Sequence, residues 1–316
     1  MIMKIPVRFD HKKGKTLSNQ TLSVEPEAPV ATQPIEPSAA IDQYKIQWPA
    51  FLFITGVHII ALAGIFTFSW KALAVCLVLH WITGGLGITL GYHRLLTHRS
   101  FKTPKLVEYF LAMMGNLACQ SGPIKWVVAH RIHHAYSDLD GDPHSPRKGF
   151  FWSHIGWCMT VNEKLDSREV HMKVAPDLAK DPVMVMMDNT HILWTILLAA
   201  GLYVWGGWPF VIWGIFVRLV LVYHCTWLVN SAAHIWGYKT YKSSDDSTNL
   251  WWVALVTYGE GWHNNHHAFQ YSARHGLKWW EFDSTYLMIQ FLEFFKLASA
   301  VKLPPQRLLN EKALTA

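Results

Sequence analysis

The hydrophobic positions of this chain are concentrated in four long stretches separated by short breaks. The stretches lie at residues 49–68, 72–92, 190–207 and 209–230. At 1.5 Å per residue, helices of this length span roughly the 30 Å hydrocarbon core of a bilayer. Only Ser69, Trp70 and Lys71 separate the first two stretches, and a Gly-Gly-Trp-Pro turn separates the last two. The pattern therefore predicts four membrane-spanning helices arranged as two hairpins.

The remaining segments divide the chain further. Residues 1–45 begin with a basic stretch and continue with Pro, Ala, Ser and Glu, a composition that buries little apolar surface and predicts a disordered tail. Two apolar segments, 106–119 and 250–258, are too short to span and predict interfacial or re-entrant helices. We expect an all-α membrane domain at 46–303, a cap made of 93–189 and 231–303, and a C-terminal tail at 304–316.

Composition supports a membrane protein and gives its orientation. The chain is 51% hydrophobic and 14% aromatic, and only 16% of its residues are charged. Its net charge of +6 comes from basic residues that flank apolar segments, which favours lipid headgroups and an acidic protein partner over nucleic acid. Nearly all Lys and Arg fall on the side of the tail and the cap, so that side is predicted to be cytoplasmic. The four cysteines form no CxxC pair and are interpreted as small core residues.

A histidine pattern, His-x-x-His-His, occurs twice, at His130/His133/His134 and at His263/His266/His267. On a helix, positions i, i+3 and i+4 share a face, so each motif can direct its imidazoles toward one point. Imidazole binds iron, zinc, copper and nickel well. The two motifs therefore indicate a metal site.

Three further histidines stand where the predicted spans end. His93 and His98 follow the second span and His234 follows the fourth, so nine histidines reach the cytoplasmic ends of the spans. Nine are too many for one ion and suit two. On an ideal α-helix, residues five apart point about 140° away from each other. We therefore expect His93 and His98 to straddle a helix end or to bind different metals.

These residues resemble the membrane fatty acid desaturases, in the branch of stearoyl-CoA desaturase and the bacterial and plant Δ9 acyl-lipid desaturases. The resemblance covers about residues 48–303. HRLLTH, HRIHH and HNNHH are similar to the three histidine boxes of that family, and NSAAH is similar to its additional ligand motif. The linking stretches DPHSPRKGFFWSHIGW and GEGWHNNHH match as well.

The resemblance implies a di-iron centre held by nine histidines, with Asn230 binding one metal through a water. The implied ligands are His93, His98, His130, His133, His134, His234, His263, His266 and His267. With electrons supplied from the cytoplasm, such a centre uses O₂ to remove two hydrogens from adjacent acyl carbons, here to form a cis double bond, expected at Δ9. The matching positions of the substrate tunnel are Gln120, Trp126, Thr226 and Trp227.

The resemblance also bears on the substrate, the donor and the location. Animal acyl-CoA desaturases carry an Arg-Asp pair before the second box, where this chain has Val128 and Ala129. We therefore expect a lipid-linked acyl chain, with acyl-CoA as the alternative. No cytochrome b5-like haem domain follows residue 303, so we expect a separate donor, either ferredoxin or cytochrome b5. We expect a multi-pass protein of the bacterial inner membrane with both termini in the cytoplasm.

Other polar residues receive structural interpretations. His58, His80, His191 and His224 lie in apolar spans and are expected to hydrogen-bond neighbouring helices. Arg218, also inside a span, needs a structural partner. His144 and His154 are expected to support the site without binding metal. Asp138, Asp140 and Asp142 are ordinary turn residues or hydrogen-bond partners of the box histidines.

Three other functions remain open. A membrane di-iron hydroxylase starts from the same C–H abstraction. A zinc-dependent membrane hydrolase needs only three protein ligands and an open water position, and no HExxH motif occurs. A metal transporter would need ligands near the middle of the spans, whereas these histidines lie at the ends.

Overall fold

A computed structural model describes residues 45–314, and within that range the fold is helical, with isolated β-bridges but no strand. The predicted tail lies outside the described residues except for Lys45. The N-terminal half comprises α1 Trp48–Ala61, η1 Leu62–Ile65, α2 Trp70–His80, η2 Trp81–Thr97, α3 Lys105–Asn116, α4 Pro123–Tyr136, η3 Pro146–Lys148, α5 Phe150–His154 and η4 Gly156–Met159. The C-terminal half comprises α6 Glu163–Asp166, α7 Arg168–Val174, α8 Pro176–Ala179, α9 Pro182–Asn189, α10 His191–Val211, η5 Ile212–Val217, α11 Arg218–Asn230, α12 Ala232–Ile235, α13 Trp251–Val256, α14 His263–Ala268, α15 Ser284–Phe294 and α16 Gln306–Lys312.

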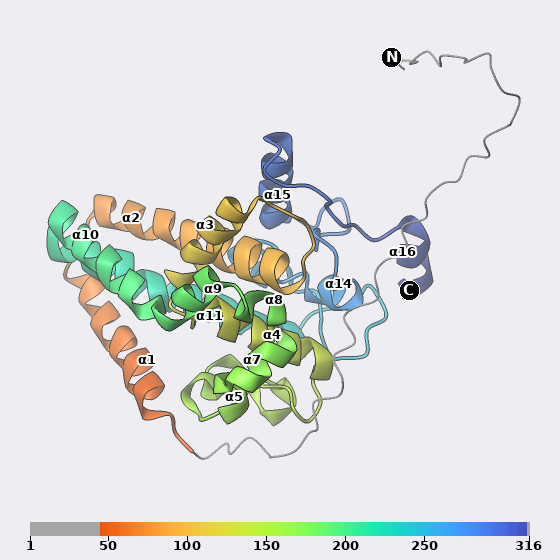
Figure 1. Ribbon diagram of the computed structural model, residues 1–316, viewed down its shortest axis with the longest axis horizontal. Coiled ribbons are helices and arrows are strands. Elements are labelled where there is room, and N and C mark those ends of the chain that lie inside the picture. The colour runs from red at the N-terminus through yellow and green to blue at the C-terminus, as the bar shows by residue number, and fades with distance from the viewer. Residues whose placement is uncertain (1–44, 315–316) are drawn as a thin grey trace, which may run out of the picture. The chain divides into compact units, whose positions relative to one another are not determined.

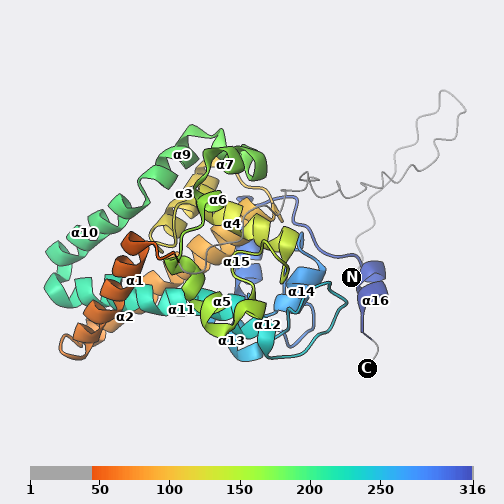
Figure 2. The ribbon, with the colours of Figure 1, turned by 90° about the horizontal axis from the view of Figure 1, so that it is seen from below.

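Three helical runs are long and apolar enough to cross a membrane. They are Trp48–Ile65, Trp70–Thr97 and His191–Ile235. The third run is not one straight helix, because Gly207 has φ 65° and ψ −160°, a conformation that favours glycine. The chain reverses near this residue, so that α10 and α11 run in roughly opposite directions (Figure 2), and α11 packs against α2. The break lies in the predicted Gly-Gly-Trp-Pro turn.

The second apolar run changes its winding near the middle. Residues up to His80 form an α-helix, whereas Trp81–Thr97 form a π-helix, whose hydrogen bonds join residues five apart. The backbone of this π-helix packs closely against α3. A Cβ added at Gly87 would lie 2.5 Å from the backbone nitrogen of Gly115, so only glycine allows this approach.

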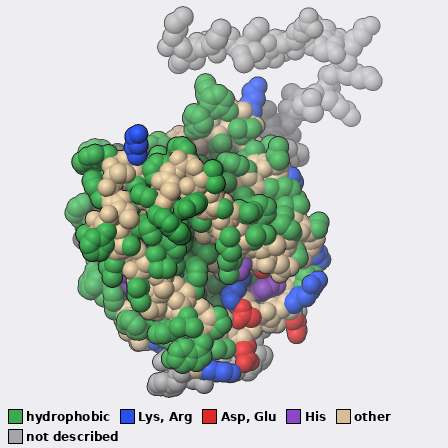
Figure 3. Space-filling view, turned by 90° about the vertical axis from the view of Figure 1, so that its left-hand side faces the viewer, with side chains coloured by type: hydrophobic (Ala, Val, Ile, Leu, Met, Phe, Trp, Pro, Cys, Tyr) green, Lys and Arg blue, Asp and Glu red, His purple; other side chains and the backbone are tan. Residues whose placement is uncertain are grey.

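The apolar runs gather at one end of the described unit, and the shorter helices form a compact region at the other (Figures 1 and 2). Viewed from the end where α1, α2 and α10 lie, the surface is mainly hydrophobic, with few charged side chains (Figure 3). Both short apolar segments are helical, as α3 and α13. Each exposes apolar side chains, including Leu106 and Phe110 on α3 and Trp251 and Leu255 on α13.

The C-terminal segment contains a helix that folds back on the short-helix region. The Lys312 ammonium group donates to the carbonyl of Ala268 at 2.7 Å and lies over the ring of Phe269. Tyr241 pairs with Ala313 in a β-bridge. The described part of the tail predicted at 304–316, up to residue 314, therefore contacts the segment that carries the third histidine motif.

Polar groups inside the apolar runs have partners on neighbouring helices, as predicted. The fully buried Arg218 donates to the carbonyls of Gly214 and Leu117 and to the hydroxyl of Thr83. The Nε2 atoms of His58 and His224 lie 3.2 Å apart, and His80 hydrogen-bonds Tyr258. His191 hydrogen-bonds the Asp188 carbonyl of the adjoining helix α9. The four cysteines are free and buried or half-buried, consistent with a core role.

Candidate metal centre

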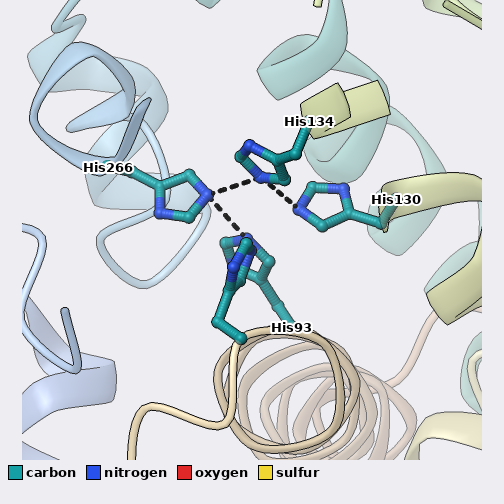
Figure 4. A group of neighbouring side chains, drawn as sticks. His93, His130, His134 and His266 are labelled. Atoms are coloured by element: carbon teal, nitrogen blue, oxygen red, sulfur yellow. Dashed lines mark hydrogen bonds between the residues drawn. The ribbon is translucent and has the colours of Figure 1, made fainter. Parts of the chain in front are cut away.

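The nine predicted histidines converge on two adjoining groups. Within each group, one ring nitrogen from every member lies within 4.8 Å of the others. The five-histidine group consists of His93, His98, His130, His134 and His266, and the four-histidine group consists of His133, His234, His263 and His267. Figure 4 shows His93, His130, His134 and His266 pointing toward one another from three separate elements. The two groups touch, since the rings of His134 and His267 are 4.6 Å apart.

Each His-x-x-His-His motif is divided between the two groups, so the expectation that each motif aims at one point is wrong. On α4, His130 and His134 join the five-histidine group while His133 joins the other. On α14 the division is reversed, because His266 alone joins the five-histidine group. On an α-helix, positions i and i+4 lie about 40° apart, whereas i+3 is turned about 60° to the other side of i, so one motif can face two centres.

His93 and His98 meet in the same group, and this depends on the π-helical winding. His93 lies in η2, and His98 is the first residue after its end. The His98 amide donates to the His93 carbonyl at 3.1 Å, and the two ring centroids are 4.8 Å apart. The prediction that they straddle a helix end is confirmed. The 140° separation of an ideal α-helix does not apply here, because the wider turn brings residues five apart close together.

The ring nitrogens are arranged as a cation site would require. The Nε2 atom of His266 lies 3.1 Å from that of His93 and 2.9 Å from that of His134. A ring nitrogen carries at most one hydrogen, so these contacts cannot all be ordinary hydrogen bonds. In the other group, the Nε2 atoms of His133 and His267 are buried without a hydrogen-bond partner among residues 45–314. Converging lone pairs of this kind fit metal ions held between the rings.

Carboxylates hold the outer nitrogens of several of these rings. In the four-histidine group, His133 Nδ1 donates to Asp142 at 3.0 Å, His234 Nδ1 to Asp138 at 3.1 Å and His267 Nδ1 to Asp245 at 2.7 Å. Such bonds fix the tautomer, so that Nε2 keeps its lone pair for a metal. The predicted role of Asp138 and Asp142 as partners of box histidines is confirmed. Asp140 is exposed and forms no hydrogen bond or ion pair with a histidine of residues 45–314.

A second buried network supports His93. Glu260 Oε2 lies 2.8 Å from His93 Nδ1 and 2.9 Å from His275 Nδ1. Its other oxygen accepts from Arg94, whose guanidinium also donates to Asp283 at 2.9 Å. Arg94 is fully buried, so the two carboxylates balance its charge where water is absent.

Sequence reasoning missed several members of the site. Asp245 and Asp283 lie far from the histidine motifs in sequence, and Glu260 was quoted only as part of GEGWHNNHH. His275 stands outside the histidine motifs, yet its ring is buried 4.4 Å from that of His266. The one available signal was the acidic residue three positions before His263. The others depend on loops that only the tertiary structure brings to the site.

Burial keeps most of the imidazoles neutral. It lowers the pKa values of His130, His134, His263 and His266 well below the ordinary range, and neighbouring imidazoles lower them further. Burial also lowers the pKa of His133, but the carboxylates of Asp142, Asp138 and Asp245 together outweigh burial and raise the net pKa. Burial tends to raise the pKa of Glu260, whereas Arg94 holds it well below its usual value. Neutral imidazoles and charged carboxylates are the forms that metal binding needs.

An apolar cavity opens beside the histidines, between η2, α4 and α11. Its wall includes His93, His130 and His263 at the metal centre. The remaining lining residues are mainly apolar or aromatic and include Ile88, Trp126, Val222, Val229 and Val256. A methylene chain placed there would lie directly beside both histidine groups.

Three of the four predicted tunnel residues lie at or beside the cavity wall, and the fourth lies in the hydrophobic core. Trp126 and Thr226 line the cavity, and the Gln120 side chain joins them by donating to the Thr226 hydroxyl at 2.9 Å and accepting from the Trp126 indole at 3.3 Å. Trp227 does not line it and is instead buried, stacked on Tyr223. Asn230 lines the cavity with His263.

The two supporting histidines lie close to the site. His144 is buried with its ring centroid 4.3 Å from that of His133, and its backbone amide donates to Asp142. His154 lies farther out, between Ser231 and His224. Neither belongs to the two groups of predicted ligands, although His144 forms a further group of possible ligands with His133 and Asp142. Their supporting roles stay predictions.

Comparison with known proteins agrees with this site. Residues 68–297 match the family model described as fatty acid desaturase. The chain is 56% identical over 265 residues to an sn-1 stearoyl-lipid 9-desaturase of Anabaena variabilis, covering 83% of this chain and 96% of that protein. It is 49% identical over 264 residues to an sn-2 palmitoyl-lipid 9-desaturase of Nostoc sp. (strain 36), covering 83% and 93%. It is 47% identical over 260 residues to an acyl-CoA C20 Delta5-desaturase of Anemone leveillei, covering 81% of each. The chain belongs to the fatty acid desaturase family.

Proposed function

We propose that this chain introduces a cis double bond at the Δ9 position of a saturated acyl chain carried by a membrane lipid. As a fatty acid desaturase it is an oxidoreductase, and two relatives at 56% and 49% identity are named stearoyl-lipid and palmitoyl-lipid 9-desaturases. One structural observation carries the proposal: nine histidines from four segments converge beside an apolar cavity. O₂ is the co-substrate, and a separate protein donates the electrons.

We assign a pair of iron ions to the two histidine groups. Bound iron would supply the redox chemistry with O₂ that removes two hydrogens from unactivated carbons. The chain's own contribution is to present neutral ring nitrogens from rigid helices and to hold their outer nitrogens on carboxylates. Asn230, beside His263 on the cavity wall, is proposed to bind one ion through a water.

The cavity selects the carbon atoms by position. A saturated chain offers no charge for recognition, so only its placement against the metal centre can choose the bond. We propose that Gln120, Thr226 and Trp126 set that placement. Hydrogen bonds join their side chains into a fixed polar group at an otherwise mainly apolar cavity wall. Ile88, Val222 and Val229 would exclude water from the reacting carbons.

We further propose that the run His191–Ile235 crosses the membrane twice, with the break at Gly207 on the outer side. Together with the first two runs this makes four spans and leaves the histidines on the cytoplasmic side, under a helical cap. Lys71 is then one of few basic residues outside. An acidic donor, ferredoxin or cytochrome b5, would approach the basic cytoplasmic face.

A buried pair of residues bears on whether the acyl chain is carried by a lipid or by coenzyme A. Val128 and Ala129, before the second histidine motif, are both apolar and buried in α4, so no charged group stands there to grip coenzyme A. We therefore favour a lipid-linked substrate. The 47% identical acyl-CoA desaturase of Anemone leveillei keeps acyl-CoA as the second candidate, which lipid-class analysis of the product separates.

Expression in a host without its own desaturase tests the proposal. We expect glycerolipids whose acyl chains have lost two hydrogens at Δ9. His266→Ala should abolish the product, because it removes a ring that contacts both His93 and His134. His191→Ala is the matched control, since its ring hydrogen-bonds the Asp188 carbonyl, outside the site. A product that gains one oxygen would instead identify a hydroxylase, and undiminished desaturation by His266→Ala would refute the assignment of the site.

A further inference from the structure

The two histidine groups differ in the carboxylates behind their imidazoles. Three of the four rings in the four-histidine group donate Nδ1 to an aspartate, namely His133 to Asp142, His234 to Asp138 and His267 to Asp245. In the five-histidine group only His93 has a carboxylate neighbour, Glu260. Within residues 45–314, no carboxylate hydrogen-bonds His98, His130, His134 or His266.

The charges of these carboxylates are also compensated differently. Glu260 forms an ion pair with Arg94, whose nitrogen lies 3.0 Å from a carboxylate oxygen, and it also contacts His275. Asp138, Asp142 and Asp245 form no ion pair with Lys or Arg in the described part of the chain, and their remaining contacts are backbone amides, the Ser247 hydroxyl and His144. Each of the three is buried. No cation of the described residues therefore neutralises their negative charge, and the full electrostatic effect of each carboxylate falls on the imidazole to which it is hydrogen-bonded.

We propose that the two metal positions are inequivalent, and that Asp138, Asp142 and Asp245 are positioning residues that make the four-histidine group bind its ion more tightly. This inference rests on the proposed di-iron function. A carboxylate behind an imidazole raises its basicity as a ligand and fixes its orientation. Three such carboxylates also offset the charge of a bound cation in a site from which water is excluded.

The number of ligands alone predicts the opposite order of metal affinity for the two groups. Five imidazoles should hold an ion more tightly than four if all imidazoles were alike. The order in which the two ions leave the protein therefore separates the effect of the carboxylates from the effect of ligand number.

Chelator titration of the full chain tests the proposal. The purified protein, loaded with Fe²⁺ without oxygen, is equilibrated with increasing bipyridine, and the iron that remains is measured. We expect two steps of one iron each. His98→Ala should eliminate the early step, because His98 belongs to the five-histidine group, and His263→Ala should eliminate the late one. A single step, or the reverse assignment, would overturn the proposal.

Neutral variants of the carboxylates identify their role. Asp245→Asn should move the late step toward weaker binding by about 10- to 100-fold, the usual effect of losing such a partner, and leave the early step in place. Glu260→Gln should move only the early step. Asp140→Asn, an exposed aspartate of the same loop as Asp138, is the matched control and should move neither. An Asp245→Asn variant that shifts both steps equally contradicts the proposal.

Two measures keep the test independent of folding and of the proposed function. Asp142→Asn repeats the experiment at a second aspartate if Asp245→Asn does not fold, as judged by circular dichroism. Two irons that leave in the expected order from a chain without desaturase activity would refute the function but support the inequivalence. An active desaturase whose irons leave together would refute only the inequivalence.

Discussion

At the scale of single residues, the candidate centre depends on keeping imidazoles neutral where water is excluded. Each ring that could bind a metal must keep a lone pair, and burial favours the uncharged form. The pKa of His267 is lowered to about 4 by burial, against the opposing effect of Asp245. The pKa of His144 is lowered to about 3, again mainly by burial. These shifts make the stability of the metal-free protein depend on pH.

The metal-free chain should lose stability as the pH falls from about 6.5 to about 4. Unfolded histidines take up protons near pH 6.5, whereas buried His267 and His144, with pKa values of about 4 and about 3, stay neutral through most of this window, so acid favours the unfolded state. His133, whose pKa is raised, acts in the opposite direction but stands against several lowered groups. The check is the apparent melting temperature of metal-free protein in detergent between pH 4 and pH 8. A flat profile over this range would contradict the burial argument.

At the scale of elements, the π-helix η2 carries the first histidine pair, and its packing against α3 holds it in place. Gly87 and Gly115 allow the two backbones to approach, and Tyr92 fills the space beside Gly115 and donates to Asn116 at 2.8 Å. The position of His93 therefore depends on the contact at Gly87, between one and two turns earlier in the same helix. A change at Gly87 should reach the metal centre although it touches no histidine.

Gly87→Ala should destabilise the protein by about 1–3 kcal/mol and lower its iron content, because the added Cβ would lie 2.5 Å from backbone atoms that cannot move alone. Gly56→Ala in α1 is the matched control, since a Cβ there meets nothing within 4 Å. Thermal unfolding and iron per chain are the measurements. Equal effects of the two substitutions would show that η2 does not need this close approach.

At the scale of the whole molecule, the apolar runs lie together at one end and the histidine groups lie where the runs meet the short helices. This arrangement lets one cavity reach both the apolar interior and the metal centre. It also requires that both hairpin turns lie on the side of the membrane opposite the cap. The proposed four-span topology therefore makes a prediction about accessibility.

Single cysteines in a background without the four native ones should report this topology. Lys71→Cys, exposed at the start of α2, and Trp208→Cys, exposed beside the break at Gly207, should react with a membrane-impermeant maleimide in intact cells. Asp140→Cys, exposed in the cap, should react only after the cells are permeabilised. Labelling of Asp140→Cys in intact cells would rule out a cytoplasmic cap.

The sequence by itself determined the apolar runs, the break near Gly207 and the identity of the nine histidines, because span length and histidine spacing are local properties of the chain. Their convergence is visible in the structure, while their role as ligands stays a prediction. Only the tertiary structure decided how the histidines divide, since each motif lies between two centres and the π-winding of η2 brings His93 to His98. It also decided which carboxylates stand behind the rings. Asp245 and Glu260 reach His267 and His93 through folded loops, and no spacing along the chain encodes that contact.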